Sequence, residues 1–133
     1  MYNRWIFTLD LDRFPVDKMQ TIVNALHANK QHYIMMIDPA IAYQPYPSFQ
    51  RAVDMNVLLK EANGEIHKGV VWAGVTAFPD CTLLSLSLAE QIYDIDKGFH
   101  PNATEWYNGE FKLFFDPETG VDIDGSWIDM NGS

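Results

Sequence analysis

Residues 32–37, His-Tyr-Ile-Met-Met-Ile, decide the fold class that the sequence predicts, and Asp38-Pro39 ends this run. The run is short and almost continuously apolar, which is typical of a parallel strand buried on both faces. Residues 18–29 precede it and carry apolar side chains at helical spacing. These side chains are Met19, Ile22, Val23 and Leu26. A helix, a loop and a buried strand in this order form one half of a βα unit, and we expect Asp17 to cap the helix.

The rest of the chain continues this alternation. We expect a loop at residues 39–56, which contain three prolines, and a hairpin around Asn63-Gly64, because both of these residues tolerate positive φ angles. Further elements are expected at residues 74–78 (strand), 102–115 (helix) and 126–130 (strand). Alternating strands and helices predict an α/β fold with a parallel sheet.

Composition and charge exclude several classes of function. The 133 residues include 18 acidic and 9 basic side chains, and the formal charge of −9 argues against a nucleic-acid partner, which needs clustered Lys and Arg. No apolar run approaches the ~20 residues of a membrane span. The single cysteine, Cys81, excludes an internal disulfide and a multi-cysteine zinc site, and the histidines show no metal-ligand spacing. We therefore expect no metal, no cofactor, no membrane span and no obligate protein partner.

Two of the expected strands end at an aspartate, Asp38 and Asp129. In α/β barrels the carboxyl ends of the strands carry the active site. Trp127 lies two residues before Asp129, hence on the same side of the strand, so that an indole face and a carboxylate could form one wall of a sugar site. Asp129 could equally cap a following helix, and Asp38 could simply open a turn before Pro39. The residues by themselves leave both interpretations open.

Five motifs occur in an order that resembles the catalytic barrel of glycoside hydrolase family 31, the α-glucosidase and α-xylosidase family. They are Phe7-Thr8-Leu9-Asp10 with Arg13-Phe14-Pro15, Asp38-Pro39-Ala40-Ile41, Gly69-Val70-Val71-Trp72, Phe78-Pro79-Asp80 and Trp127-Ile128-Asp129-Met130-Asn131. Each motif alone is a weak signal, and their shared order makes the resemblance specific.

The resemblance implies an α/β fold in the form of a partial (β/α)8 TIM barrel, about half of the barrel, with a β-hairpin insertion. It also implies hydrolysis of α-linked oligosaccharides or glucosides with retention, which uses two carboxyl groups about 5–5.5 Å apart. Asp129 matches the family's nucleophile. The residues that match the lining of its first sugar subsite are Ile41, Trp72, Trp127 and Met130.

The matching motifs cover residues 1–80 and 99–131, and the resemblance implies that residues 1–133 are a partial catalytic barrel with a non-family insertion at 81–98. The family's acid/base carboxyl group has no counterpart in this sequence. We therefore expect either a segment of a larger α-glucosidase or a truncated, non-catalytic fragment of one, and we expect the isolated chain to be inactive. The glycosylation sequon Asn102-Ala103-Thr104 suggests that the parent enzyme is secreted or enters the secretory pathway.

Overall fold

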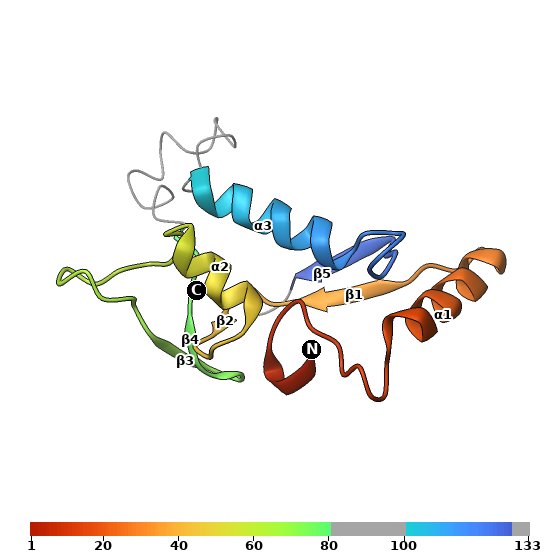
Figure 1. The fold of residues 1–133 in the computed structure, drawn as a ribbon, viewed down its shortest axis with the longest axis horizontal. Coiled ribbons are helices and arrows are strands. Elements are labelled where there is room, and N and C mark those ends of the chain that lie inside the picture. The colour runs from red at the N-terminus through yellow and green to blue at the C-terminus, as the bar shows by residue number, and fades with distance from the viewer. Residues whose placement is uncertain (81–100, 129–133) are drawn as a thin grey trace. The chain divides into compact units, whose positions relative to one another are not determined.

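The computed structural model describes residues 1–80 and 101–128, which belong to two compact units (Figure 1). The first unit comprises Met1–Pro39 and Gly109–Ser133, and the second comprises Ala40–Asn108. Helix α3 (Pro101–Phe114) therefore contributes its first part to the second unit and its last part to the first.

The first unit contains helix α1 (Val16–Ala28) and the strands β1 (Ile34–Ile37) and β5 (Gly125–Ile128), after a short 3-10 turn at Tyr2–Arg4. The two strands lie side by side in Figure 1 and pair in parallel, with Ile34 opposite Gly125 and Ile37 opposite Ile128. The predicted helix, the two strands and their parallel pairing are thus confirmed.

The predicted cap of α1 is wrong. Pro15 occupies the N-cap position with an extended backbone, and Asp17 lies inside the first turn. Proline has a fixed φ angle and no N–H, and both properties suit the start of a helix. The Asp17 carboxylate still acts favourably there, because the amino end of a helix attracts negative charge.

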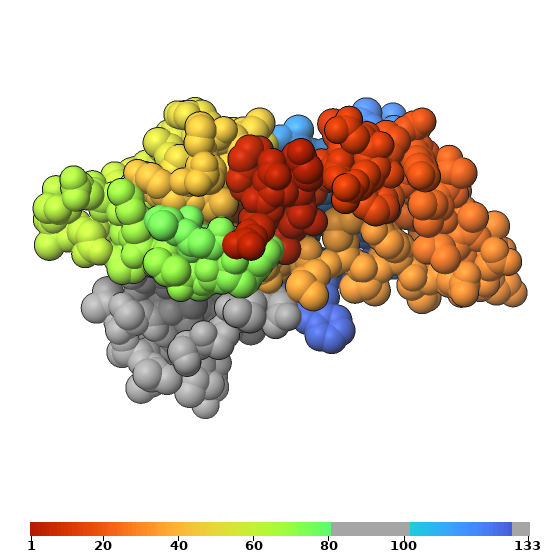
Figure 2. Space-filling model, turned by 90° about the horizontal axis from the view of Figure 1, so that it is seen from below, coloured from red at the N-terminus to blue at the C-terminus, as the bar shows by residue number. Residues whose placement is uncertain are grey.

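One face of the β1–β5 pair packs against α1. The core between the helix and the strands consists of Met19, Val23 and Val121. Met35 of β1 and Tyr33, the residue before β1, pack against this core. The alternate side chains of the strands, Ile34, Met36 and Trp127, are between 47 % and 61 % exposed. Figure 2 accordingly shows orange atoms of the β1 region and blue atoms of the β5 region at the surface. Along β1 the sheet thus has a covered face and an apolar, uncovered face, whereas at the end of β5 Ile128 is 60 % exposed although it alternates with Trp127.

The last part of α3 packs on the amino-terminal segment through aromatic rings. The Phe7 ring lies edge-on to Phe111, Phe114 and Phe115, with centroid distances of 5.4, 6.1 and 6.4 Å. Phe7 is only 7 % exposed although its φ angle is +56°, a left-handed conformation that is rare for a bulky residue. The aromatic contacts hold this strained backbone in place.

The second unit contains β2 (Ile41–Ala42), α2 (Pro47–Asp54), β3 (Gly69–Val71) and β4 (Gly74–Ala77). Its strands form an antiparallel sheet in the order β2-β4-β3, which corrects the expectation that the whole sheet is parallel. The expectation of a loop at residues 39–56 is also wrong, because this range contains β2 and α2. Pro47 stands at the first position of α2, where the missing N–H costs no hydrogen bond.

The hairpin at Asn63-Gly64 is present but short. An antiparallel bridge joins Lys60 to Ile66, and Gly64 has a φ angle of +86°. After the hairpin the chain becomes a regular strand only at Gly69, and this strand, β3, pairs with β4. The predicted strand at 74–78 is confirmed as β4.

The first part of α3 is anchored on α2 and the turn after it. Trp106 is 1 % exposed, and its indole N–H donates to the Ser48 carbonyl oxygen at 3.3 Å. The Asn102 side-chain amide donates to the Met55 carbonyl oxygen at 3.0 Å. Helix α3 confirms the helix predicted at 102–115, and the predicted insertion at 81–98 lies outside the described residues. Within the described ranges, no helix has the length and apolar character needed to cross a membrane.

Candidate active site

The parallel register of β1 and β5 defines the edge at which the candidate site lies. Ile37 pairs with Ile128, so both strands end at the same edge of the sheet. Asp38 follows β1 directly and is 2 % exposed, which makes it part of the buried strand end. Asp129 follows β5 in the sequence, but Asp129 and Met130 lie outside the described residues. The register therefore supports a shared strand edge. The positions of the Asp129 and Met130 side chains stay predictions.

Trp127 lies on the uncovered face of the first unit's sheet. It pairs with Met36, and the two side chains are 61 % and 47 % exposed. Helix α1 covers the opposite face through Tyr33 and Met35. In a barrel the helices cover the outer face of the strands and the other face points to the interior. Among the described residues the Trp127 indole is therefore an open apolar surface of the kind that a sugar platform requires. Ile128, which points to the other face of the strand, is equally exposed at 60 %, so this end of β5 is uncovered on both faces.

Ile41 and Trp72 belong to the second unit and lie at opposite ends of β4. Ile41 pairs with Ala77 and is fully buried, whereas Trp72 is in the turn that joins β3 to β4 and is 40 % exposed. The turn needs Gly74, whose φ angle is +97°. The structure thus presents the Trp72 indole to solvent and places Ile41 in the core. A sugar contact from either residue remains a prediction.

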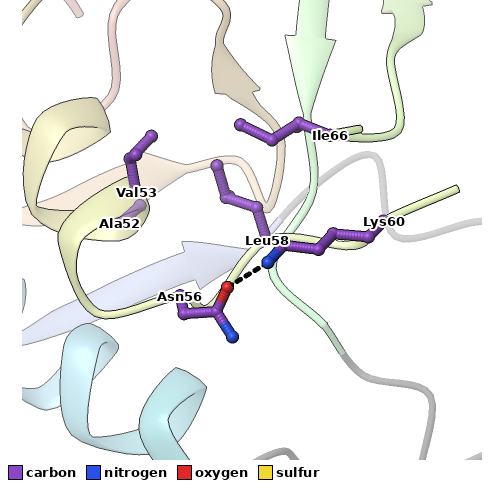
Figure 3. A pocket seen from close by; sticks show the side chains of 6 residues that line it. All are labelled: Ala52, Val53, Asn56, Leu58, Lys60 and Ile66. Carbon is purple, nitrogen blue, oxygen red and sulfur yellow. Dashed lines mark hydrogen bonds between the residues drawn. The ribbon is translucent and has the colours of Figure 1, made fainter. Parts of the chain in front are cut away.

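A cavity of about 190 Å³ lies elsewhere in the second unit, between the carboxyl end of α2 and the Lys60–Ile66 hairpin (Figure 3). Its walls are mostly apolar, and the Lys60 ammonium donates to the Asn56 side-chain oxygen at its rim. The lining residues are Ala52, Val53, Asn56, Leu58, Lys60 and Ile66. None of the predicted sugar contacts lines this cavity, and no carboxylate does, so it is not the candidate active site.

Two histidines and a carboxylate meet at the opposite edge of the first unit's sheet, where β1 and β5 begin. The Asp124 carboxylate lies 2.9 Å from His27 Nε2 and 3.2 Å from His32 Nδ1, and it accepts the Tyr33 backbone N–H at 2.7 Å. The Tyr33 N–H, followed by the two histidines, holds the pKa of the Asp124 carboxyl far below its usual range. Within residues 1–80 and 101–128 no group of three or more ligands suitable for a metal occurs.

His27 lies in the last turn of α1 and His32 lies shortly before β1, and their common partner, Asp124, was not predicted. The signal was present as Asp122-Ile123-Asp124, an acidic pair directly before a strand. Because the contact joins positions 97 residues apart, no local pattern reveals it.

A family model described as the glycosyl hydrolases family 31 TIM-barrel domain matches residues 1–133. A probable alpha/beta-glucosidase of Arthroderma benhamiae is 47 % identical over 131 residues, which are 98 % of this chain and 13 % of that protein. An alpha-glucosidase of Mucor javanicus is 38 % identical over 126 residues, 94 % of this chain and 12 % of its own length. The chain thus spans about an eighth of the curated relatives it matches.

Solved structures agree with the family model in fold. The chain is similar to the family 31 alpha-glucosidase of Bacteroides thetaiotaomicron, with a TM-score of 0.68 and 28 % identity over 98 % of this chain and 19 % of that one. It is also similar to a heterodimeric ER glucosidase II complex of a catalytic subunit and the binding domain of a regulatory subunit. That match has a TM-score of 0.70 and 22 % identity over 97 % of this chain and 12 % of that one. We interpret the edge at which β1 and β5 end by comparison with these proteins.

Proposed function

The chain belongs to the TIM-barrel domain of glycosyl hydrolases family 31, and from this membership we propose that it forms part of the catalytic barrel of a retaining α-glucosidase. The observation that carries the proposal is the family match over residues 1–133 together with the Trp-Ile-Asp-Met-Asn motif at the end of β5. The described residues supply an α/β segment with two parallel strands and an uncovered inner face.

In this proposal Asp129 is the nucleophile. Its carboxylate attacks the anomeric carbon of an α-glucoside, the leaving oxygen departs with a proton from a second carboxyl group, and a covalent glycosyl ester forms. Water then hydrolyses the ester, and the configuration at the anomeric carbon is retained. We assign only the nucleophile to this chain and expect the general acid to belong to another part of the enzyme.

Four further residues form the proposed first sugar subsite. Trp72 and Trp127 present exposed indole faces, which suit the apolar C–H faces of a pyranose ring. Met130 follows the nucleophile, and Ile41 follows the Asp38-Pro39-Ala40 turn. The assignment of Ile41 and Met130 rests on the family motif, because Ile41 is buried and Met130 is outside the described residues.

A covalent trap tests the nucleophile in the intact enzyme that contains this sequence. A fluorinated α-glucosyl fluoride reacts readily with the enzyme to form the glycosyl ester, and water hydrolyses this ester slowly. The ester therefore accumulates, and the labelled peptide identifies the attacking side chain. We expect the label on Asp129, and Asp129→Asn should abolish turnover because an amide cannot form the ester. Asp12→Asn, an exposed carboxylate far along the sequence from the motif, is the matched control and should retain activity. A label on any other residue would refute the assignment.

The alternative is a truncated, non-catalytic fragment of such an enzyme. The origin of residues 81–98 is a separate question. Their leucine-rich composition differs from that of the flanking motifs, which fits a translated intron or a late insertion in the partial barrel. Sequencing the mature transcript separates the two origins, because an intron is spliced out of the abundant message and an insertion is retained.

Activity of residues 1–133 alone separates enzyme from fragment. We expect no turnover of an aryl α-glucoside, because we assign no general acid to this chain. General acid catalysis typically raises the reaction rate by about 10²–10⁴-fold. Turnover that Asp129→Asn removes would show a self-sufficient enzyme. We also propose that the parent enzyme follows the secretory route, on the basis of the Asn102-Ala103-Thr104 sequon. In the structure the Asn102 amide donates to the Met55 carbonyl oxygen, so a glycan at Asn102 requires that this bond is not formed. Secretion of the intact protein tests the route.

A further inference from the structure

Two of the sequence motifs meet on one face of the second unit's sheet. Gly69 opens strand β3, and Phe78 directly follows β4. Gly69 pairs with Thr76, and Phe78 lies two residues beyond Thr76, hence on the same face of the sheet. A Cβ atom on Gly69 would lie 2.6 Å from Phe78 Cε2 and 3.1 Å from Phe78 Cζ. The Phe78 ring therefore occupies the space that a side chain at position 69 would need.

The backbone that carries the Phe78 ring is fixed on both sides. The Phe78 carbonyl oxygen accepts the Leu59 N–H at 2.9 Å, and an antiparallel bridge joins Leu58 to Pro79. Ala77, the residue before Phe78, is 0 % exposed, and Leu58 is 4 % exposed. Because this backbone is paired and its neighbours are buried, the core of the second unit determines where the ring lies.

Strand β3 lies at the edge of this sheet, whose described strands have the order β2-β4-β3. Val70, its central residue, is 80 % exposed, and Val75, opposite Val70, is 49 % exposed. This cross-strand pair buries little apolar area and so contributes little to holding β3 in place. The Phe78 ring, in contrast, ties Gly69 and the start of β3 to the buried end of β4.

Trp72 depends on the position of β3 because it stands in the two-residue turn that joins β3 to β4. Val71 pairs with Gly74 across this turn, and a displacement of β3 relative to β4 therefore moves the indole. We propose that Phe78 is a positioning residue for Trp72: its ring, seated on Gly69, fixes the β3–β4 hairpin and hence the sugar platform at its tip. The inference rests on the proposed role of Trp72 in the first sugar subsite.

Steady-state kinetics of the intact enzyme that contains this sequence test the inference with an aryl α-glucoside. Trp72→Ala measures what the platform itself contributes, and we expect it to raise KM about three- to tenfold, the range of one aromatic contact. Gly69→Ala places a methyl group against the Phe78 ring and should raise KM by up to the same factor. A general loss of folded enzyme would lower kcat and leave KM unchanged, so the kinetics separate positioning from stability.

Three further variants show whether the effect passes through the ring and the indole. Phe78→Leu removes the ring without adding an atom at position 69, so it should also raise KM, and it decides the question if Gly69→Ala does not fold. The double variant Gly69→Ala/Trp72→Ala should have the KM of Trp72→Ala alone, because a positioning effect needs the indole. Val70→Ala is the matched control, since Val70 is the next residue of β3 and points to the opposite face, and it should keep the wild-type KM.

The outcomes separate this inference from the proposed function. A raised KM in Trp72→Ala beside a wild-type KM in either Gly69→Ala or Phe78→Leu would overturn the inference and leave the proposed subsite standing. A further rise in KM when Gly69→Ala is added to Trp72→Ala would also overturn it, because the effect would then bypass the indole. A wild-type KM in Trp72→Ala would instead refute the proposed role of Trp72, and the inference with it.

Discussion

Gly120 lies where the chain passes closest to the end of α3, and the substitution Gly120→Ala should strongly destabilise the first unit. A Cβ atom at this position would lie 2.4 Å from the Phe114 carbonyl oxygen, 2.9 Å from its carbonyl carbon and 3.0 Å from the Asp116 nitrogen. Ordinary van der Waals contact begins at 3.4 Å. All three atoms are backbone, so no side chain can rotate away.

The new Cβ atom and the Phe114 carbonyl oxygen would have to move apart by about 1 Å. This movement would strain the hydrogen bonds that fix the segment. The Val121 N–H donates to the same Phe114 oxygen at 3.1 Å, and the Gln20 side chain donates to the Gly120 oxygen at 3.0 Å. Overpacking of this kind costs about 1–3 kcal/mol, and a rigid backbone neighbour favours the upper end. We therefore expect Gly120→Ala to lower Tm by about 10 °C.

Gly109→Ala is the matched control, because it makes the same chemical change inside α3 with nothing within 4 Å of the new Cβ. Replacing a glycine in a helix interior by alanine should raise the stability by about 0.5–1 kcal/mol. Urea and thermal unfolding followed by tryptophan fluorescence measure both variants. Equal or increased stability of Gly120→Ala would refute the steric argument, and destabilisation by Gly109→Ala would show that the glycine effect is not local.

Three smaller predictions concern single side chains. Val23→Ala should cost about 2 kcal/mol in thermal unfolding, because the side chain is fully buried in the α1 core and leaves a cavity. The Thr119 backbone N–H and hydroxyl and the Glu118 N–H lower the pKa of Asp116, so its contribution is present above pH 3.8 and is lost as the pH falls below that value. Asp116→Ala should therefore be less stable than the wild type at neutral pH, and the difference should shrink in urea titrations at acidic pH. Trp127→Ala should change the unfolding free energy by less than about 0.5 kcal/mol, because the indole is 61 % exposed, and a large loss of stability would contradict its role as an open platform.

The elements that the sequence predicted well have strong local patterns. Helix α1 follows from its apolar spacing, and β1 follows from a continuous apolar run that ends at Asp38-Pro39. Helix α2 was missed because Pro45 and Pro47 suggest a loop, although Pro47 is well placed at the start of a helix. Strand β2 is two residues long and exists only through its pairing with β4, so no local pattern could predict it.

The family was predictable from the sequence, and the roles of the candidate site residues stay predictions. The order of the motifs identified the family, and the parallel register of β1 and β5 confirmed the shared strand edge. The exposure of Trp127 and the burial of Ile41 depend on which side of each sheet is covered, and that is a tertiary property. The contact of Asp124 with His27 likewise requires chain closure over nearly a hundred residues.

The discontinuous course of the first unit determines the order in which the chain can fold during synthesis. The second unit is one uninterrupted stretch, Ala40–Asn108, whereas the first needs Met1–Pro39 together with residues from Gly109 onward. Strand β1 must therefore wait for β5, and the closure of so long a loop is slow. On the ribosome the second unit can form first, while the apolar residues of α1 and β1 remain without their partner strand. Translation speed through residues 40–124 thus sets how long that surface is open to chaperones and to aggregation.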